Sequence, residues 1–261
     1  MIRVLTYNIL NGGDGRESLL GDVIGHAHAD IIVLQEVANP AFVQNLAREL
    51  DCDWFVADSN HARRKLALLS RFPITARNSH HLFPLHRTLL EAQIEIAPNR
   101  RLALFGVHLV APSHLIPFEW WQAWELRVIL QRVRAVAAQP CIIAGDFNAI
   151  APHEAVDVAA LPPWLRQAIA LQGGRIARRT IATMQRAGLI DCYRLLHLHD
   201  DGHTVPARAP NGRLDYIFVN DALRGAVRSC DVVAEPSAVR AASDHLPVMM
   251  DFCLDGVATT D

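Results

Sequence analysis

Short apolar segments of strand length alternate with segments of helical periodicity along the whole chain, and no obvious linker separates them. This order predicts strands over Arg3–Asn8, Ala29–Val37, Trp54–Ala57, Leu66–Ser70, Ile74–His81, Leu89–Ile96, Arg101–Val110, Cys141–Gly145, Leu214–Val219, Ser229–Ala234 and Leu246–Phe252. It predicts helices over Glu17–His28, Pro40–Leu50, Pro117–Ala138 and Ile181–Ala187. Two packed sheets covered by helices would enclose such an order around one core.

Length and composition restrict the class of protein. A chain of 261 residues is long enough for one large domain or two smaller ones, and without a linker we expect one domain over residues 1–261. No apolar stretch approaches the roughly 18 residues that a membrane-spanning helix needs. The first residues, MIRVLTYNIL, contain one arginine and are interrupted by Asn8, which favours a strand over a secretory signal, so we expect a cytoplasmic protein. The five cysteines are widely spaced and form no CxxC pair, so we expect reduced thiols.

The net charge of -2 gives the molecule no basic field with which to hold a nucleic acid. A nucleic acid therefore stays among the candidate substrates only if a local basic patch binds it. No pattern in the sequence specifies an oligomeric state.

Carboxylates and amides close two of the apolar strands. Glu36 follows the run Ile-Ile-Val-Leu-Gln, and a second strand passes through Gly145 into Asp146 and Asn148, which lie on one side of an extended segment. A buried carboxylate needs a partner or a metal ion, so both motifs are candidate site residues. Taken alone, Glu36 also fits a surface glutamate that ends a strand, and Asp146 with Asn148 also fits an Asp/Asn turn.

Histidines and aspartates mark three further strands. Asp215 lies in the apolar run LDYIFV, Asp244 and His245 precede the last strand, and His108 interrupts LALFGVHLV. An aspartate bonded to one imidazole nitrogen fixes the tautomer of a histidine, so Asp215 and a histidine form a natural pair. His108 alone fits a core histidine equally well.

Six motifs occur in one order, namely TYNIL with Asn8, LQEV with Glu36, GVHL with His108, GDFNA with Asp146 and Asn148, RLDYIFV with Asp215, and SDHLPV with Asp244 and His245. In this order they resemble the endonuclease/exonuclease/phosphatase superfamily, the fold of pancreatic deoxyribonuclease, over nearly the whole chain. The resemblance implies an α+β fold, a four-layer α/β/β/α sandwich in which two packed mixed sheets are flanked by helices. It places the active site at one edge of the two sheets.

The resemblance also implies a divalent metal, Mg²⁺ or Mn²⁺. Glu36 would be its main ligand, helped by Asn8 and Asp244, with Asp146 and Asn148 as further ligands. All of these side chains offer hard oxygen atoms, which suit Mg²⁺.

Catalytic roles follow from the same resemblance. Asp215 would orient His245, which would contact the scissile phosphate or take a proton from water. Asp146 would align that water, Asn148 would hold a phosphate oxygen, and His108 would stabilise or protonate the leaving-group side. Histidine suits such proton transfer near neutral pH.

The predicted function is therefore metal-dependent hydrolysis of a phosphodiester, in nucleic acid or in a small or lipid-derived diester. A phosphomonoesterase acting on a sugar, inositol or nucleotide phosphate is the alternative, and an inactive binding protein on the same fold is a third.

Two departures from the superfamily's motifs narrow the choice of substrate. Leu10 stands where AP endonucleases commonly place an acid, which disfavours abasic-site repair, and Arg63, Arg64 and Lys65 stand where secreted deoxyribonucleases support the histidine matching His108.

Two segments are candidates for substrate selection. Ile150–Arg179 contains Trp164, Arg166, Arg175, Arg178 and Arg179. We hypothesise that some of this segment covers the cleft and supplies charge for phosphate binding, with a solvated helical insert as the alternative. Pro117–Trp124 contains several aromatic residues. Their helical spacing favours packing in the core, and contact with a lipid or a base is the alternative.

Overall fold

The computed structural model describes residues 1–111, 118–161, 163–171, 173–174, 176 and 178–253, and two sheets dominate it. The order of the first sheet is β11 (Val227–Val232), β12 (Val248–Phe252), β1 (Ile2–Asn8), β2 (Ile31–Val37), β4 (Lys65–Ser70) and β3 (Asp53–Ala57). The order of the second is β5 (Ile74–His80), β6 (Leu89–Ala97), β7 (Arg100–His108), β8 (Cys141–Asp146), β10 (Asp215–Val219) and β9 (Ile190–Asp191).

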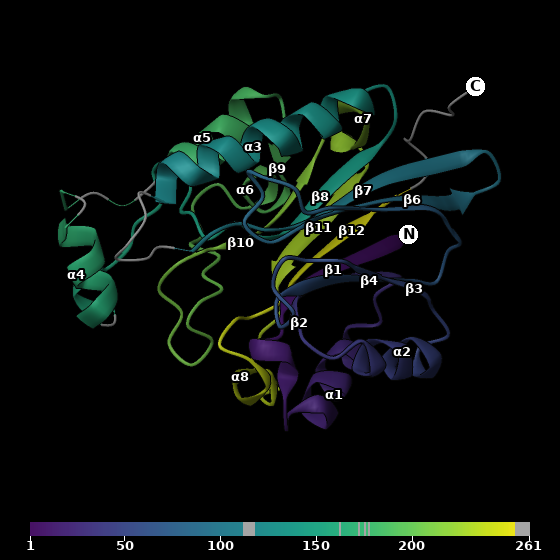
Figure 1. Cartoon of the computed structure of the whole chain (residues 1–261), viewed down its shortest axis with the longest axis horizontal. Helices are drawn as coiled ribbons and strands as arrows, with labels where there is room; N and C mark the ends of the chain where they lie inside the picture. The colour runs from purple at the N-terminus through teal and green to yellow at the C-terminus, as the bar shows by residue number, and fades with distance from the viewer. Residues whose placement is uncertain (112–117, 162, 172, 175, 177, 254–261) are drawn as a thin grey trace.

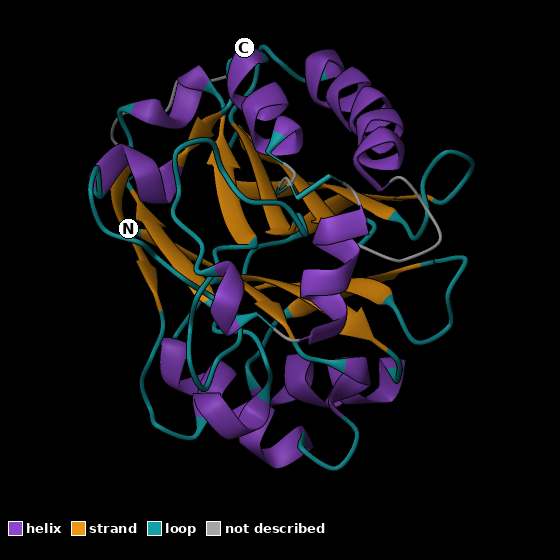
Figure 2. Ribbon diagram, turned by 90° about the vertical axis from the view of Figure 1, so that its left-hand side faces the viewer, coloured by secondary structure: helices purple, strands orange, loops and turns teal. Residues whose placement is uncertain are grey.

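Helices cover the outer faces of both sheets (Figures 1 and 2). The first sheet packs against α1 (Glu17–Ala27), α2 (Pro40–Glu49) and α8 (Val239–Ala242), and the second packs against α3 (Phe118–Ala135) and α5 (Arg179–Arg186). The layers are therefore helix, sheet, sheet and helix, which confirms the predicted α/β/β/α sandwich. Within the described part of the chain, no helix combines the length and the apolar character needed to cross a membrane.

The central strands are buried on both faces, which explains why their sequences are nearly continuous apolar runs. In β1, Ile2 and Val4 face the second sheet, whereas Leu5 and Tyr7 face the helices. The same alternation continues in β2, where Val33 faces inward. One apolar layer thus lies between the sheets and another lies beneath each helical layer.

Two strand pairs are parallel, and they position the site. β1 pairs with β2 in the first sheet and β7 pairs with β8 in the second, so that the carboxyl ends of all four strands lie at one edge. β10 runs antiparallel to β8 and begins with Asp215 directly opposite Asp146. The loops that follow these strands therefore meet at the same edge of the sandwich.

The elements that the sequence did not predict are short ones. They are β9, α6 (Cys192–Leu196), α7 (Asp221–Arg224), α8 and the 3₁₀ turns Asn11–Gly13 and Val158–Ala160. The segment after Asp146, predicted to be irregular, also contains α4 (Pro163–Leu171), which lies at the left-hand margin of Figure 1. The predicted start of the third helix at Pro117 lies outside the described residues.

Candidate active site

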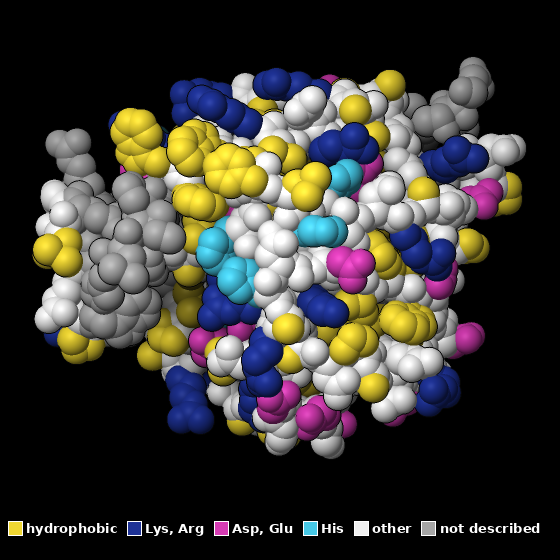
Figure 3. Space-filling view, in the orientation of Figure 1, with side chains coloured by type: hydrophobic (Ala, Val, Ile, Leu, Met, Phe, Trp, Pro, Cys, Tyr) yellow, Lys and Arg dark blue, Asp and Glu magenta, His cyan; other side chains and the backbone are white. Residues whose placement is uncertain are grey.

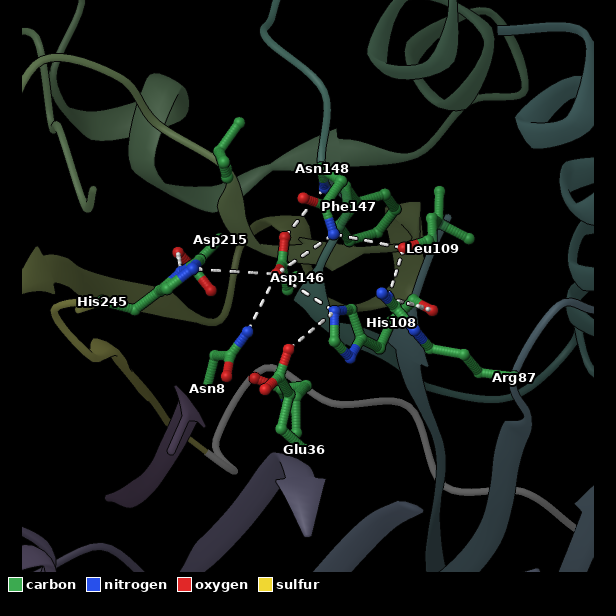
Figure 4. Close-up of polar contacts among 12 residues, drawn as sticks. Asn8, Glu36, Arg87, His108, Leu109, Asp146, Phe147, Asn148, Asp215 and His245 are labelled. Carbon is green, nitrogen blue, oxygen red and sulfur yellow. Dashed lines mark hydrogen bonds and ion pairs between the residues drawn. The ribbon is translucent and has the colours of Figure 1, made fainter. Parts of the chain in front are cut away.

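Four of the candidate residues lie at the ends of the parallel strands (Figure 4). Asn8 ends β1, Glu36 lies near the end of β2, His108 ends β7 and Asp146 ends β8. All four side chains are buried or nearly so. The sandwich therefore brings together residues that are widely separated in the sequence.

Asp146 is the centre of this cluster. Its Oδ2 accepts hydrogen bonds from Nδ2 of Asn8 at 3.0 Å and of Asn148 at 3.2 Å, and its Oδ1 accepts the backbone N–H of Asn148 at 2.8 Å. The Nε2 atoms of His108 and His245 lie 3.3 and 3.9 Å from Oδ2. One carboxylate thus holds two amides and lies between two imidazole rings.

The backbone around Asp146 is specialised. Gly145 has a φ of 149°, and a Cβ atom at this position would lie 1.9 Å from the carbonyl oxygen of Val107. Asn148 has a left-handed φ of 46°, a conformation that asparagine tolerates better than most residues. These features turn the end of β8 so that both Asp146 and Asn148 face the site.

Asp215 and His245 form the predicted pair. His245 Nδ1 lies 2.8 Å from Asp215 Oδ2, and Thr204 Oγ1 donates to the same oxygen at 2.6 Å. Because Nδ1 is engaged with Asp215, the Nε2 atom of His245 is directed toward Asp146. The structure places the two residues as the sequence predicted.

Glu36 faces His108 across the site. Its Oε2 accepts the backbone N–H of Asn11 at 2.7 Å, and its Oε1 lies 3.9 Å from His108 Nε2. Glu36 also has a left-handed φ of 63°, an unusual backbone conformation for glutamate that interrupts the pairing of β2 with β4. Such outliers concentrate at functional sites, where the surrounding structure maintains the strain.

Charge and burial give the two histidines opposite properties. Burial and the nearby Arg87 guanidinium lower the pKa of His108 to about 4, despite its contact with Asp146. Burial would also lower the pKa of His245, but the charge and hydrogen bond of Asp215 raise it to about 10. With these pKa values, His108 is neutral and His245 is charged at neutral pH.

The same neighbours act on Asp146. Burial alone would raise the pKa of this carboxyl, yet His108 and the charge of His245 hold it well below its ordinary value. Asp146 is therefore an anion that accepts hydrogen bonds from the groups around it.

Arg87 is a site neighbour that sequence reasoning missed. It is 2% exposed, and its Nη1 donates to the carbonyl oxygens of His108 and Leu109. The carbonyl oxygen of Leu109 also accepts from Asn148 Nδ2 at 3.1 Å. The one available signal was an arginine directly before an apolar strand, in HRTLLEAQI, and that pattern alone resembles a surface residue.

Two proposed metal ligands are placed differently from the others. Asp244 is exposed, and its Oδ1 accepts a hydrogen bond from Ser243 Oγ at 3.5 Å. Asn8 uses both ends of its amide, because Nδ2 donates to Asp146 and Oδ1 accepts the N–H of Leu10 at 3.1 Å. For Asn8 the geometry shows a contact that orients Asp146, and its role as a metal ligand stays a prediction, as it does for Asp244.

The chemistry of the remaining donors suits a hard divalent cation. Glu36 Oε1 accepts no hydrogen bond from the described residues, and Asp146 supplies a second carboxylate across the site. Ligand atoms of Asp146, Asp215 and His245 also lie within 4.8 Å of one another. An oxygen-rich set with carboxylates of this kind fits Mg²⁺ or Mn²⁺.

The phosphate-binding role of the segment after Asp146 stays a prediction, and the structure shows a local contact for one of its arginines. Arg178 donates to the backbone carbonyl oxygens of Ala151 and Glu154, so its guanidinium fixes the local chain. Arg166 and Arg179 are exposed. Arg175 and the side chain of Trp164 lie outside the described part of the structure.

The aromatic residues in the first turns of α3 are more exposed than the sequence predicted. Trp120 is 69% exposed and Trp124 is 40% exposed, so the prediction that they pack in the core was wrong. The buried stripe of α3 begins instead with the polar residues Gln122 and Glu125. Gln122 donates to the carbonyl oxygen of Val110, and Glu125 accepts the N–H of that residue, which ties the helix to the end of β7.

The four-layer sandwich and the carboxylate, amide and histidine cluster at its edge are those of a phosphate-ester hydrolase. The model of the endonuclease/exonuclease/phosphatase family matches residues 5–245, and the chain belongs to this family. A comparison with curated proteins found no matching relative.

Solved structures share the fold at low sequence identity. A 3′ phosphatase, NExo, from Neisseria bound to a product DNA hairpin is 20% identical with a TM-score of 0.75, covering 97% of this chain and 100% of that one. An AP endonuclease from Archaeoglobus fulgidus is 17% identical with a TM-score of 0.76 and the same coverage. The human Nocturnin catalytic domain with a bound sulfate is 21% identical with a TM-score of 0.74, covering 97% and 94%. The three resemble this chain along its length.

Proposed function

We propose that the protein is a divalent-metal-dependent phosphodiesterase. The observation that supports this most directly is the position of two histidines on either side of Asp146, with His108 Nε2 at 3.3 Å and His245 Nε2 at 3.9 Å from the same oxygen. Hydrolysis of a phosphodiester needs an aligned water, positive charge beside the phosphate oxygens and a group that assists the leaving oxygen. The arrangement supplies a candidate for each side of the scissile bond.

The metal would be held by Glu36 and Asp146. A bound Mg²⁺ or Mn²⁺ supplies Lewis acidity, which neutralises charge on the non-bridging phosphate oxygens. The remaining work belongs to the side chains of this protein.

Each side chain takes its role from its contacts. Asp146 aligns the attacking water, because its two oxygen atoms are fixed by the amides of Asn8 and Asn148. His245, oriented by Asp215, contacts the phosphate from its Nε2 side. His108, neutral and with Nε2 facing the site, assists the leaving oxygen, and Asn148 binds a phosphate oxygen after exchanging one of its amide contacts.

His108 lacks the acidic partner that secreted deoxyribonucleases provide, as the sequence suggested. Its Nδ1 is buried and has no hydrogen-bond partner among the described residues. Burial and the positive charge of Arg87 both lower the pKa of the ring. We infer that His108 acts as a neutral donor rather than as a permanently charged group.

Two further expectations belong to this proposal. All five cysteines are unpaired, which supports a reducing compartment such as the cytoplasm. Phosphomonoesterase activity is the second candidate, because one of the structures that share the fold is described as a 3′ phosphatase. The same catalytic residues could act on a phosphate with one ester bond or with two.

The decisive experiment compares bis(p-nitrophenyl) phosphate with p-nitrophenyl phosphate in the presence of Mg²⁺, Mn²⁺ or EDTA. We expect metal-dependent turnover that is faster on the diester and is lost in Glu36→Ala. Glu49→Ala is the matched control, because Glu49 is exposed at the end of α2. Faster cleavage of the monoester would favour phosphomonoesterase activity over the proposed phosphodiesterase. Equal turnover with metal and with EDTA would overturn metal dependence.

A further inference from the structure

Large apolar side chains gather on one exposed surface beside the site. We define the aromatic rim as Leu82, Phe83, Trp120, Trp121 and Trp124. Leu82, Phe83 and Trp120 are 79%, 76% and 69% exposed, which is unusual for residues of this size. Figure 3 shows hydrophobic side chains over the left-hand part of α3, next to a group of histidines.

The rim is a packed unit contributed by two segments. The Phe83 ring centroid lies 5.9 Å from that of Trp121 and 6.1 Å from that of Trp124, and the two tryptophans lie 6.0 Å apart. Trp121 Nε1 also donates to the carbonyl oxygen of Pro84 at 2.9 Å. The loop between β5 and β6 is thereby fixed to the first turns of α3.

The rim is connected directly to the catalytic loops. Next to the tryptophans, Gln122 Nε2 donates to the carbonyl oxygens of Val110, Phe147 and Asn148 at 2.8, 3.1 and 3.3 Å. Glu125 accepts the N–H of His86, which precedes the site neighbour Arg87. A surface bound by the rim would therefore lie beside the candidate active site.

Basic residues flank the rim. The loop between β3 and β4 contacts the loop that carries Leu82 and Phe83, because Asn60 Nδ2 donates to the carbonyl oxygen of His81 and the His61 ring stacks on that of His86 at 4.8 Å. Arg64 ends this loop and Lys65 begins β4; both are half-buried, and neither forms an ion pair with any residue that the structure describes. The flank therefore offers unneutralised positive charge next to an apolar surface.

The composition of the surface favours a lipid bilayer over a nucleic acid. Phe83 and Trp121 meet edge-to-face, and the contacts of Trp124 with both rings are tilted, so these rings do not form a row of parallel platforms for successive bases. Leu82 adds an aliphatic side chain, which has no face for stacking. Tryptophan beside Phe and Leu, bordered by basic side chains, is typical of proteins that lie on an anionic membrane surface.

We propose that the aromatic rim docks on an anionic phospholipid bilayer. Leu82, Phe83 and Trp120 enter the boundary between headgroups and acyl chains, while Arg64 and Lys65 bind headgroup phosphates. Docking of this kind places the catalytic loops at the level of the headgroups, so the substrate class is a phosphate ester borne by the membrane. That consequence rests on the proposed function, whereas docking itself does not.

The test is co-flotation of the metal-loaded protein with extruded vesicles. One set contains phosphatidylcholine alone and the other also contains about 30% phosphatidylserine. We expect binding to the anionic vesicles, at least about tenfold weaker in Leu82→Ser/Phe83→Ser and in Trp120→Ser. Leu198→Ser is the matched control, because Leu198 is 71% exposed outside the rim and its replacement should leave binding unchanged.

Soluble-substrate turnover separates this proposal from the catalytic one. Hydrolysis of bis(p-nitrophenyl) phosphate should be unchanged in the rim variants, because their side chains are exposed and lie outside the catalytic cluster. Inactivity of the wild type on this substrate, with vesicle binding intact, would remove the proposed function and leave docking standing.

Four outcomes would overturn docking. They are no wild-type flotation, equal flotation of the rim variants, equal binding to the neutral and anionic vesicles, and rim-dependent dimerisation in light scattering without vesicle binding. Rim-dependent capture of a single-stranded oligonucleotide without flotation would assign the surface to nucleic acid instead.

Discussion

His245 Nδ1 lies 2.8 Å from Asp215 Oδ2, although 30 residues separate the two in the sequence. Asp215 begins β10 opposite Asp146, and Thr204 donates to the same carboxylate oxygen as His245. The aspartate therefore fixes both the orientation and the charge of the ring whose Nε2 faces Asp146. A conservative change at Asp215 tests this relationship.

We expect Asp215→Asn to lower kcat by about 10²- to 10⁴-fold with little change in KM. The amide preserves the size of the side chain but removes the charge that favours the protonated ring and its tautomer. Steady-state kinetics on bis(p-nitrophenyl) phosphate measure the effect, and Asp221→Asn, at an exposed position, is the control. A rise in KM at constant kcat would show that Asp215 contributes to substrate binding instead.

The sequence predicted the long elements and most of the residues that cluster around Asp146, because both leave local signals. Strands such as β1 and β8 are apolar runs that end in a polar residue, and the motifs follow the order of a known superfamily. The two-residue strand β9 and the four-residue helices α7 and α8 are too short to show any periodicity.

The features that the sequence missed depend on contacts between distant segments. Trp120 and Trp124 have helical spacing, yet α3 turns Gln122 and Glu125 inward because backbone groups of the neighbouring loops need partners. Arg87 is buried for the same reason, since it donates to carbonyl oxygens at the end of β7. The apolar pattern alone predicts that the tryptophans of α3 face inward and that Gln122, Glu125 and Arg87 face solvent.

Gly145→Ala tests whether the turn at the end of β8 requires glycine. The added Cβ would lie 1.9 Å from the Val107 carbonyl oxygen at a φ of 149°, so the free energy of unfolding should fall by about 3 kcal/mol or more. Gly225→Ala is the control, because a Cβ atom added there would meet no atom within 4 Å and the φ of Gly225 is -74°. Urea unfolding compares the two, and equal effects would refute a special role for Gly145.

Arg213 should be needed for stability because it neutralises two buried carboxylates. It binds Asp191 through Nη1 at 2.8 Å and Nη2 at 2.6 Å, and its Nε donates to Glu154 at 2.9 Å. Arg213→Met would leave both acids without this partner, and we expect it to cost about 3–5 kcal/mol in the free energy of unfolding. Arg224→Met, at an exposed position, should change it by less than about 0.5 kcal/mol, and a similarly small loss for Arg213→Met would contradict the prediction.

Glu125 should make the stability of the protein fall as the pH rises. Burial raises the pKa of its carboxyl from 4.5 to about 7, although the backbone N–H groups of Val110 and His86 oppose the shift. The folded protein therefore binds this proton more tightly than the unfolded chain does. The favourable contribution is complete below about pH 4.5 and is lost as the pH approaches 7, a change of about 3 kcal/mol.

Glu125→Gln removes the titration while keeping the shape of the side chain. The amide offers only one acceptor oxygen to two N–H donors, so the variant should be less stable at low pH by about 1–3 kcal/mol. Because Gln stays neutral, this deficit should shrink or reverse between about pH 5 and pH 8. Urea unfolding of both proteins across that range measures the difference, with Glu49→Gln as an exposed control. A deficit that is independent of pH would mean that Glu125 keeps one charge state throughout.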